Sequence, residues 1–193
     1  MPPSLCLNLA EQEQFRLLDI ARRSIRSGLE SGRAVQLDTE QLDKSLRIEA
    51  AVFVTLTRLG ELRGCIGSLQ PTDTLAQAVA NSAFSAAFRD RRFNRLQSAE
   101  VDELCIEVSI LSEMVPIEVT DRQDLLDTLQ PGLDGLLLED RGYRSTFLPK
   151  VWEKIKSPNE FLEQLMLKAG LPAGHWSGTI KFYRYHTLTF AEK

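Results

Sequence analysis

The sequence contains few residues of the kinds that bind metals or form disulfide frameworks. It has three cysteines, Cys6, Cys65 and Cys105, which are odd in number and widely spaced. This pattern is typical of reduced thiols in the cytoplasm, so we predict a cytoplasmic protein. The two histidines, His175 and His186, lie eleven residues apart and no CxxC motif occurs. We therefore predict no metal site.

Other absences exclude further classes of protein. No stretch approaches the ~18 consecutive apolar residues that a membrane span needs, and residues 1–10 lack the basic start of a signal peptide. The net charge of −4 disfavours a nucleic-acid coat, which is normally basic. The chain also has no phosphate-binding loop and no recognisable catalytic triad. From these absences we predict that the protein has no membrane partner and that nucleic acid is a disfavoured partner. No motif in the sequence identifies a cofactor.

The hydrophobic pattern predicts an α+β protein. Alternating β-branched and apolar residues predict strands in two hairpins, 51–58 with 62–69 and 136–139 with 143–148, and in single strands at 103–111 and 179–187. Helical spacing, with start and stop signals, predicts helices near 11–28, 74–89, 121–129 and 157–170, and a short one from Pro149. This order favours a mixed, largely antiparallel sheet with flanking helices.

No repeat, low-complexity tract or linker divides the 193 residues. We therefore predict one domain over residues 1–193, with a smaller α/β lobe within about 115–170.

The stretch GELRGCIGSL, residues 60–69, places a cysteine and an arginine among three glycines within a predicted hairpin. Strand alternation would put Arg63, Cys65 and Gly67 on one face. An arginine beside a thiol favours the reactive thiolate, and glycines leave room for a ligand. Free cysteine is also among the most buried residues and packs as a small hydrophobe. The sequence leaves both interpretations open.

Two further stretches carry candidate residues. FRDRRFNR, residues 88–95, combines four arginines with two phenylalanines, which suits an anionic ligand or a stacked base. Cations at the end of a helix also simply complement its dipole. In the strand 103–111, alternation places Cys105, Glu107 and Ser109 on one face, which either lines a pocket or is merely half exposed.

Four ordered motifs carry a resemblance to a known family. FVTLTRLGELRGCIGSL, SAFSAAFRDRRF, IEVSIL and YRSTFLPKVW resemble the AMMECR domain family, whose prokaryotic members are called AmmeMemoRadiSam system protein A. The segment LRGCIG is the family's signature without a change, and the match runs from about Phe15 to the last strand. The chain departs from the family at Asn94 and Arg95, where prolines are usual.

The resemblance implies an α+β domain but no established reaction. By the name of its system, it implies a Memo-like protein and a radical-SAM protein as partners. The residues that match the family's motifs are Arg63, Gly64, Cys65, Gly67, Asp90, Arg92, Phe93, Glu107, Ser109, Thr146, Leu148 and Pro149.

Three hypotheses for function follow. The first is an enzyme or modification factor in a glycine-lined cleft, with Cys65 as nucleophile or redox thiol and Glu107 as acid or base. In it, Arg63 and Arg92 hold an anionic substrate, and the remaining ligand-binding candidates are Gly64, Gly67, Asp90, Phe93, Ser109 and Thr146. The second is a binding module without chemistry, for a protein partner or an anionic or nucleotide ligand. In the third, the signature only builds an unusual hairpin and its packing.

Overall fold

The computed structural model describes residues 9–192. Cys6, and most of the segment 1–10 on which the signal-peptide prediction rests, lie outside the described residues. The described chain forms two compact units. The N-terminal unit comprises residues 9–111 and 188–192, and the C-terminal unit comprises residues 112–187. Whether the two units act as one domain stays a prediction.

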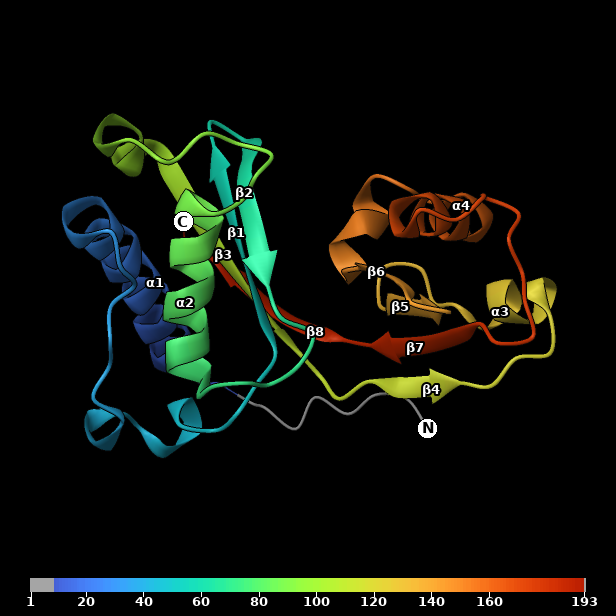
Figure 1. The fold of residues 1–193 in the computed structure, drawn as a ribbon. Helices are drawn as coiled ribbons and strands as arrows, with labels where there is room; N and C mark the ends of the chain where they lie inside the picture. Colours follow the sequence, from blue (N-terminus) through green and yellow to red (C-terminus); the bar gives the residue numbers. More distant parts are fainter. Residues whose placement is uncertain (1–8, 193) are drawn as a thin grey trace. The chain divides into compact units, whose positions relative to one another are not determined.

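The N-terminal unit is a four-stranded antiparallel sheet covered on one face by two helices (Figure 1). Its strand order is β2-β1-β3-β8, which makes β2 an edge strand. The strands are β1 Val52–Arg58, β2 Glu61–Gly67, β3 Leu104–Leu111 and β8 Thr187–Ala191. The helices are α1 Glu11–Ser31 and α2 Leu75–Phe88, with short 3₁₀ turns at Thr39–Gln41, Lys44–Leu46 and Ser98–Glu103.

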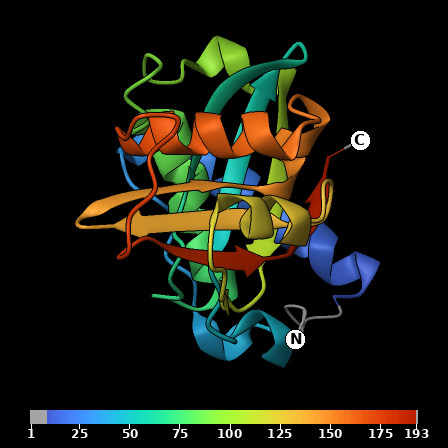
Figure 2. The ribbon, with the colours of Figure 1, turned by 90° about the vertical axis from the view of Figure 1, so that its right-hand side faces the viewer.

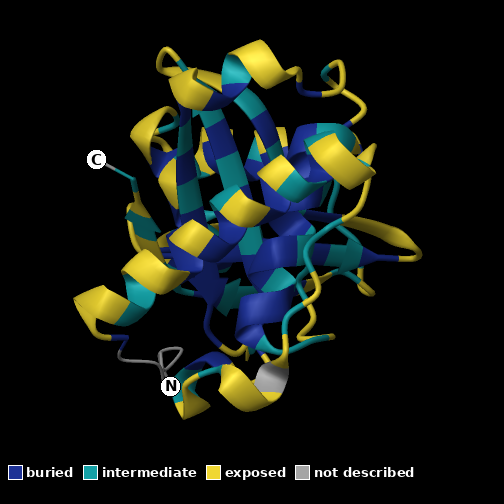
Figure 3. Ribbon diagram, turned by 90° about the vertical axis from the view of Figure 1, so that its left-hand side faces the viewer, coloured by how far each residue is buried: buried dark blue, intermediate teal, exposed yellow. Residues whose placement is uncertain are grey.

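Alternation along the central strands determines which face the helices cover. Val52, Val54 and Leu56 of β1 are buried to 1% exposure or less, and Ile106 and Val108 of β3 are fully buried beside them. These side chains join α1 and α2 in one hydrophobic core. Figure 3 shows α1 exposed along its outer surface and buried toward the sheet. The opposite face of the sheet carries Thr55, Cys65 and Glu107.

The C-terminal unit contains the second antiparallel sheet, of order β4-β7-β5-β6, packed against α4 (Figure 2). Its strands are β4 Val115–Ile117, β5 Gly135–Asp140, β6 Tyr143–Phe147 and β7 Lys181–Tyr185. The helices are α3 Arg122–Thr128, a 3₁₀ turn at Pro149–Glu153, and α4 Pro158–Ala169. Trp152 and Phe161 stack at 3.8 Å in the core of this unit.

The α+β class is confirmed, as is the sheet's largely antiparallel character. The strand predicted at 179–187 is present as β7, but the separate strand β8, which follows His186 and belongs to the other sheet, was not predicted. The short strand β4 was not predicted from the sequence. Helix α4 begins as expected, since Ser157 Oγ accepts a hydrogen bond from the Glu160 N–H and Gly170 ends the helix with a φ of 83°.

Candidate functional site

The outer edge of β2 is closed by residues that follow α2. The backbone N–H of Cys65 donates to Asp90 Oδ2 at 2.9 Å, and Arg92 Nη2 donates to the Cys65 carbonyl at 3.3 Å. An edge strand presents unpaired backbone groups, and buried ones must find a partner. Asp90 and Arg92 therefore supply, from side chains, the hydrogen bonds that a further strand would make.

Asp90 and Arg92 also bind each other through a two-point contact. Arg92 Nε lies 3.0 Å from Asp90 Oδ1, and Nη2 lies 2.7 Å from Oδ2. The Asp90 side chain is only 4% exposed, whereas that of Arg92 is 56% exposed. The Arg92 guanidinium and the backbone N–H groups of Cys65 and Arg92 lower the pKa of Asp90 to about 2. Asp90 is therefore ionised at neutral pH and serves as an acceptor.

The simple alternation that would place Arg63 and Cys65 on one face is interrupted by an irregularity of β2. The register pairs Leu56 with Gly64 and Thr57 with Leu62, so Arg63 is the extra residue of a β-bulge. Its Nε and Nη2 donate to Glu100 at 2.8 and 3.1 Å, and Nη2 also donates to the Asn94 carbonyl at 2.9 Å. Arg63 thereby fastens the segment after α2 to β2.

Glu100 is the carboxylate at the centre of this network. Arg63 lowers the pKa of Glu100 to about 2, chiefly through its side-chain hydrogen bond, with help from the Gln97 N–H and the charge of Arg58. The Glu100 side chain is 13% exposed, as is that of Arg63. Arg63 Nη1 is buried and has no hydrogen-bond partner among the described residues.

The two inner glycines of the signature are explained by close packing. A Cβ on Gly64 would lie 2.2 Å from the carbonyl oxygen of Ala86 in α2. A Cβ on Gly67 would lie 2.2 Å from the carbonyl oxygen of Val52 in β1. Neither clash can be relieved by moving a flexible side chain, so both positions require glycine. The glycines let the hairpin approach α2 and its own partner strand.

Cys65 lies in a row of three side chains that crosses the sheet. It pairs with Thr55 of β1, which in turn pairs with Glu107 of β3. The Thr55 hydroxyl donates to Cys65 Sγ at 3.3 Å. In the neighbouring row, Ser109 is 4% exposed and its hydroxyl lies 3.0 Å from that of Thr189. Cys65 itself is half-buried, as Glu107 is.

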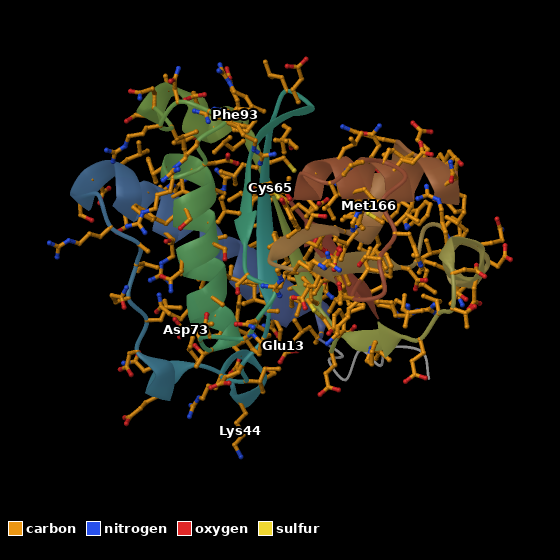
Figure 4. The ribbon with its side chains drawn as sticks, turned by 45° about the vertical axis from the view of Figure 1, so that its right-hand side comes forward. Glu13, Lys44, Cys65, Asp73, Phe93 and Met166 are labelled. Atoms are coloured by element: carbon orange, nitrogen blue, oxygen red, sulfur yellow. The ribbon has the colours of Figure 1, made fainter. Side chains whose placement is uncertain are left out.

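The aromatic rings of the segment 88–95 are covered by the protein's own groups. The guanidinium groups of Arg63 and Arg92 lie 5.9 and 5.5 Å from the centre of the Phe93 ring. That of Arg95 lies 5.9 Å from the centre of the Phe88 ring. Such distances are typical of cation–π contacts, which fix a guanidinium plane while leaving its N–H edge free. Figure 4 labels Cys65 on β2 and Phe93 in the loop beyond α2.

A cavity of about 610 Å³ opens beside these residues. It is lined by Arg63, Arg92, Phe93, Asn94, Arg95, Gln97 and Glu100. Three arginines and one carboxylate give this lining an excess of positive charge. No carboxylate of a described residue lies within ion-pair distance of Arg95.

The remaining predicted site residue, Thr146, lies in the C-terminal unit. Its hydroxyl donates to the Leu136 carbonyl at 2.9 Å and lies 2.6 Å from the hydroxyl of Tyr185. Burial raises the pKa of Tyr185. These contacts connect strands of one sheet, so the Thr146 hydroxyl is engaged in holding that sheet together.

Both histidines are bound to buried carboxylates within the C-terminal unit. His175 Nε2 lies 2.6 Å from Asp140 Oδ2, and His186 Nε2 lies 3.2 Å from Asp134 Oδ1. Hydrogen bonds from Thr179, His175 and Ser177 lower the pKa of Asp140 to about 2. The described residues contain no group of three or more potential metal ligands.

Sequence reasoning missed Glu100 and Thr55. Glu100 lies 37 residues from Arg63 in a short polar turn, where nothing in the sequence distinguishes it from its neighbours. Thr55 could have been found from the sequence, because the position of the predicted hairpin turn indicates which residue of the first strand pairs with Cys65.

Comparison with known proteins agrees with the resemblance seen in the sequence. The AMMECR1 family model matches residues 18–190. The chain belongs to the AMMECR1 family. This AMMECR1-family chain is 34% identical over 200 residues to a protein of Thermofilum pendens, with 95% of the chain and 92% of the relative covered. It is also 34% identical to a protein of Methanothermobacter thermautotrophicus, covering 95% and 96%.

The fold is shared with a solved relative. The crystal structure of an uncharacterized protein from Pyrococcus horikoshii matches the AMMECR1-family chain with a TM-score of 0.86 and 32% identity, covering 92% of this chain and 90% of that one. The names of these relatives state no activity. Within the described residues, no helix is long and apolar enough to cross a membrane.

Proposed function

We propose that this AMMECR1-family chain is a binding module for an anionic ligand, held in the cavity between β2 and the segment 89–97. One observation carries the proposal. Arg92 and Arg95 both line the cavity; Arg95 has no carboxylate of a described residue within ion-pair distance, and Arg92 binds Asp90 and the Cys65 carbonyl through Nε and Nη2, which leaves Nη1 outside its described hydrogen bonds. The volume of about 610 Å³ falls within the usual range for small-ligand sites.

The other arginine–carboxylate pairs support this role by holding the cavity wall in place. Arg63 binds Glu100 and the Asn94 carbonyl, while Asp90 binds the Cys65 N–H. A loop fixed at both ends loses little conformational freedom when a ligand binds, which favours affinity. Arg63, Asp90 and Phe93 therefore position the site, and Arg92 and Arg95 contact the ligand.

Titration calorimetry with inorganic pyrophosphate tests the proposal. Arg95→Ala is expected to weaken binding at least about tenfold, the equivalent of one charge-assisted hydrogen bond. Arg91→Ala is the matched control, because Arg91 is an exposed arginine of the same segment that does not line the cavity. Equal weakening in both variants would indicate general attraction to a basic segment and would contradict a defined site.

A second candidate is thiol chemistry at Cys65, with Glu107 as acid or base. It is favoured by the row Cys65–Thr55–Glu107 and by the hydroxyl that donates to Sγ. In this case a thiol reagent should label Cys65 of the folded chain faster than Cys105, which is also half-buried and serves as the internal reference. A Cys65 that reacts only after unfolding would rule the chemistry out.

The wider context of the chain remains a proposal as well. A cytoplasmic location, and a Memo-like and a radical-SAM protein as partners, rest on the cysteine pattern and on the resemblance to the AMMECR family.

A further inference from the structure

We infer that the ligand of the arginine-lined cavity is a compact oxyanion with two neighbouring anionic groups, recognised by charge and not by a stacked ring. This inference rests on the proposed function and names the class of ligand. A diphosphate and a small polycarboxylate both have this chemistry, namely two neighbouring anionic groups.

The number of anionic groups follows from the arginines that line the cavity. Arg92 and Arg95 both line the cavity, Arg92 Nη1 makes none of the described hydrogen bonds, and no carboxylate of a described residue lies within ion-pair distance of Arg95. Arg63 adds positive charge to the same wall, but Glu100 offsets it. Asp90 already occupies the Nε–Nη2 fork of Arg92, so Arg92 offers a ligand only the two N–H bonds of Nη1, which suit one anionic oxygen. The guanidinium fork of Arg95 suits a second phosphate or carboxylate group, so the pair matches two neighbouring anionic groups.

The absence of ring stacking follows from the occupied aromatic faces. Two guanidinium groups already contact Phe93. Phe88 contacts the Arg95 guanidinium and packs on Phe84 at a centroid distance of 5.1 Å. Its ring also lies against Gly28 of α1, where an added Cβ would be 2.2 Å from a ring carbon of Phe88. A nucleobase would have to displace these contacts to stack, and would lose part of the gain that stacking normally brings. The earlier hypothesis of a base stacked on Phe88 or Phe93 is therefore set aside in favour of charge recognition.

Titration calorimetry with three probes, namely inorganic pyrophosphate, ADP and citrate, tests the inference. ADP and pyrophosphate carry the same diphosphate, so their dissociation constants are expected to agree within about threefold. Phe93→Leu should leave the ratio of the two constants unchanged, and a thermal melt verifies that this variant is folded. Citrate binding more tightly than pyrophosphate would identify a carboxylate source, and the reverse a phosphate source. Both results support a compact oxyanion.

Two outcomes would overturn the inference, and they differ from each other. If ADP binds more than about tenfold tighter than pyrophosphate and Phe93→Leu removes this advantage, a ring does stack, and the anion site stands without the inference. If neither pyrophosphate, ADP nor citrate binds, the proposed function itself fails, and the inference fails with it.

Discussion

Asp90 and Cys65 are joined by a side-chain-to-backbone hydrogen bond of 2.9 Å, from the Cys65 N–H to Asp90 Oδ2. Arg92 completes the contact by donating to the Cys65 carbonyl while it binds Asp90. Cys65, the cysteine of the signature segment, is therefore held through its backbone by two residues that lie 25 and 27 positions later in the chain. Arg92 links this contact to the proposed site, because it closes the strand edge and also lines the cavity.

Removal of Asp90 is expected to destabilise the fold. In Asp90→Ala, the Cys65 N–H and the Arg92 guanidinium lose their acceptor, and we expect the free energy of unfolding to fall by about 2–3 kcal/mol. Urea denaturation measures this change. Asp102→Ala, which removes an exposed carboxylate from the same unit, should change stability by less than about 0.5 kcal/mol. Equal effects of the two substitutions would show that the edge contact contributes nothing specific.

The sequence predicted the elements that periodicity alone specifies. The alternation in residues 103–111 correctly separated the buried face of β3 from the face with Glu107, and the capping pattern at Ser157 located the start of α4. Strand β8 was missed because nothing in the composition around His186 indicates that the chain passes there from one sheet to another. The bulge at Arg63 was missed because alternation along the strand does not reveal an extra residue, and Glu100, the partner of Arg63, lies 37 residues away.

Gly64→Ala should be among the most damaging single substitutions in the N-terminal unit. The new Cβ would lie 2.2 Å from the Ala86 carbonyl oxygen, so α2 must move away from the sheet. We expect a loss of about 3 kcal/mol or more, because overpacking against backbone cannot be relieved by a rotamer change. Gly178→Ala is the control, since nothing lies within 4 Å of a Cβ at that position and its φ is not positive. A wild-type melting temperature for Gly64→Ala would contradict the packing explanation.

Leu59 at the tip of the first hairpin is in a strained conformation. It is 81% exposed and has a φ of 52°, followed by Gly60 at 84°. Two positive φ values in a two-residue turn favour asparagine followed by glycine. Leu59→Asn is therefore expected to stabilise the chain by about 0.5–1 kcal/mol. Leu62 is a second exposed leucine whose φ is not positive, so Leu62→Asn should bring no gain in chemical denaturation. An equal gain in both variants would assign the effect to the loss of exposed apolar surface.

Cys65→Ser should be tolerated by the fold. Cys65 is half-buried, and the Thr55 hydroxyl that now contacts Sγ can exchange a hydrogen bond with a serine oxygen. The expected loss is below about 1 kcal/mol, less than the cost of burying an unpaired hydroxyl. Denaturation of Cys65→Ser and of the double variant with Thr55→Val measures this compensation. A large loss for the single substitution would favour a purely structural role for the cysteine.

Stability should depend on pH through Asp90 and Glu100, whose pKa values are both lowered to about 2. A lowered pKa in the folded state means that the unfolded chain binds protons first as the pH falls. The stabilisation is therefore complete above about pH 5 and is lost progressively as the pH falls toward 2. Because Arg92 is largely exposed, we expect the Asp90 contribution to be about 1–2 kcal/mol, less than the full shift would give. Asp90→Asn should flatten the stability curve between pH 5 and 2, and an unchanged slope would mean that Asp90 does not titrate with unfolding.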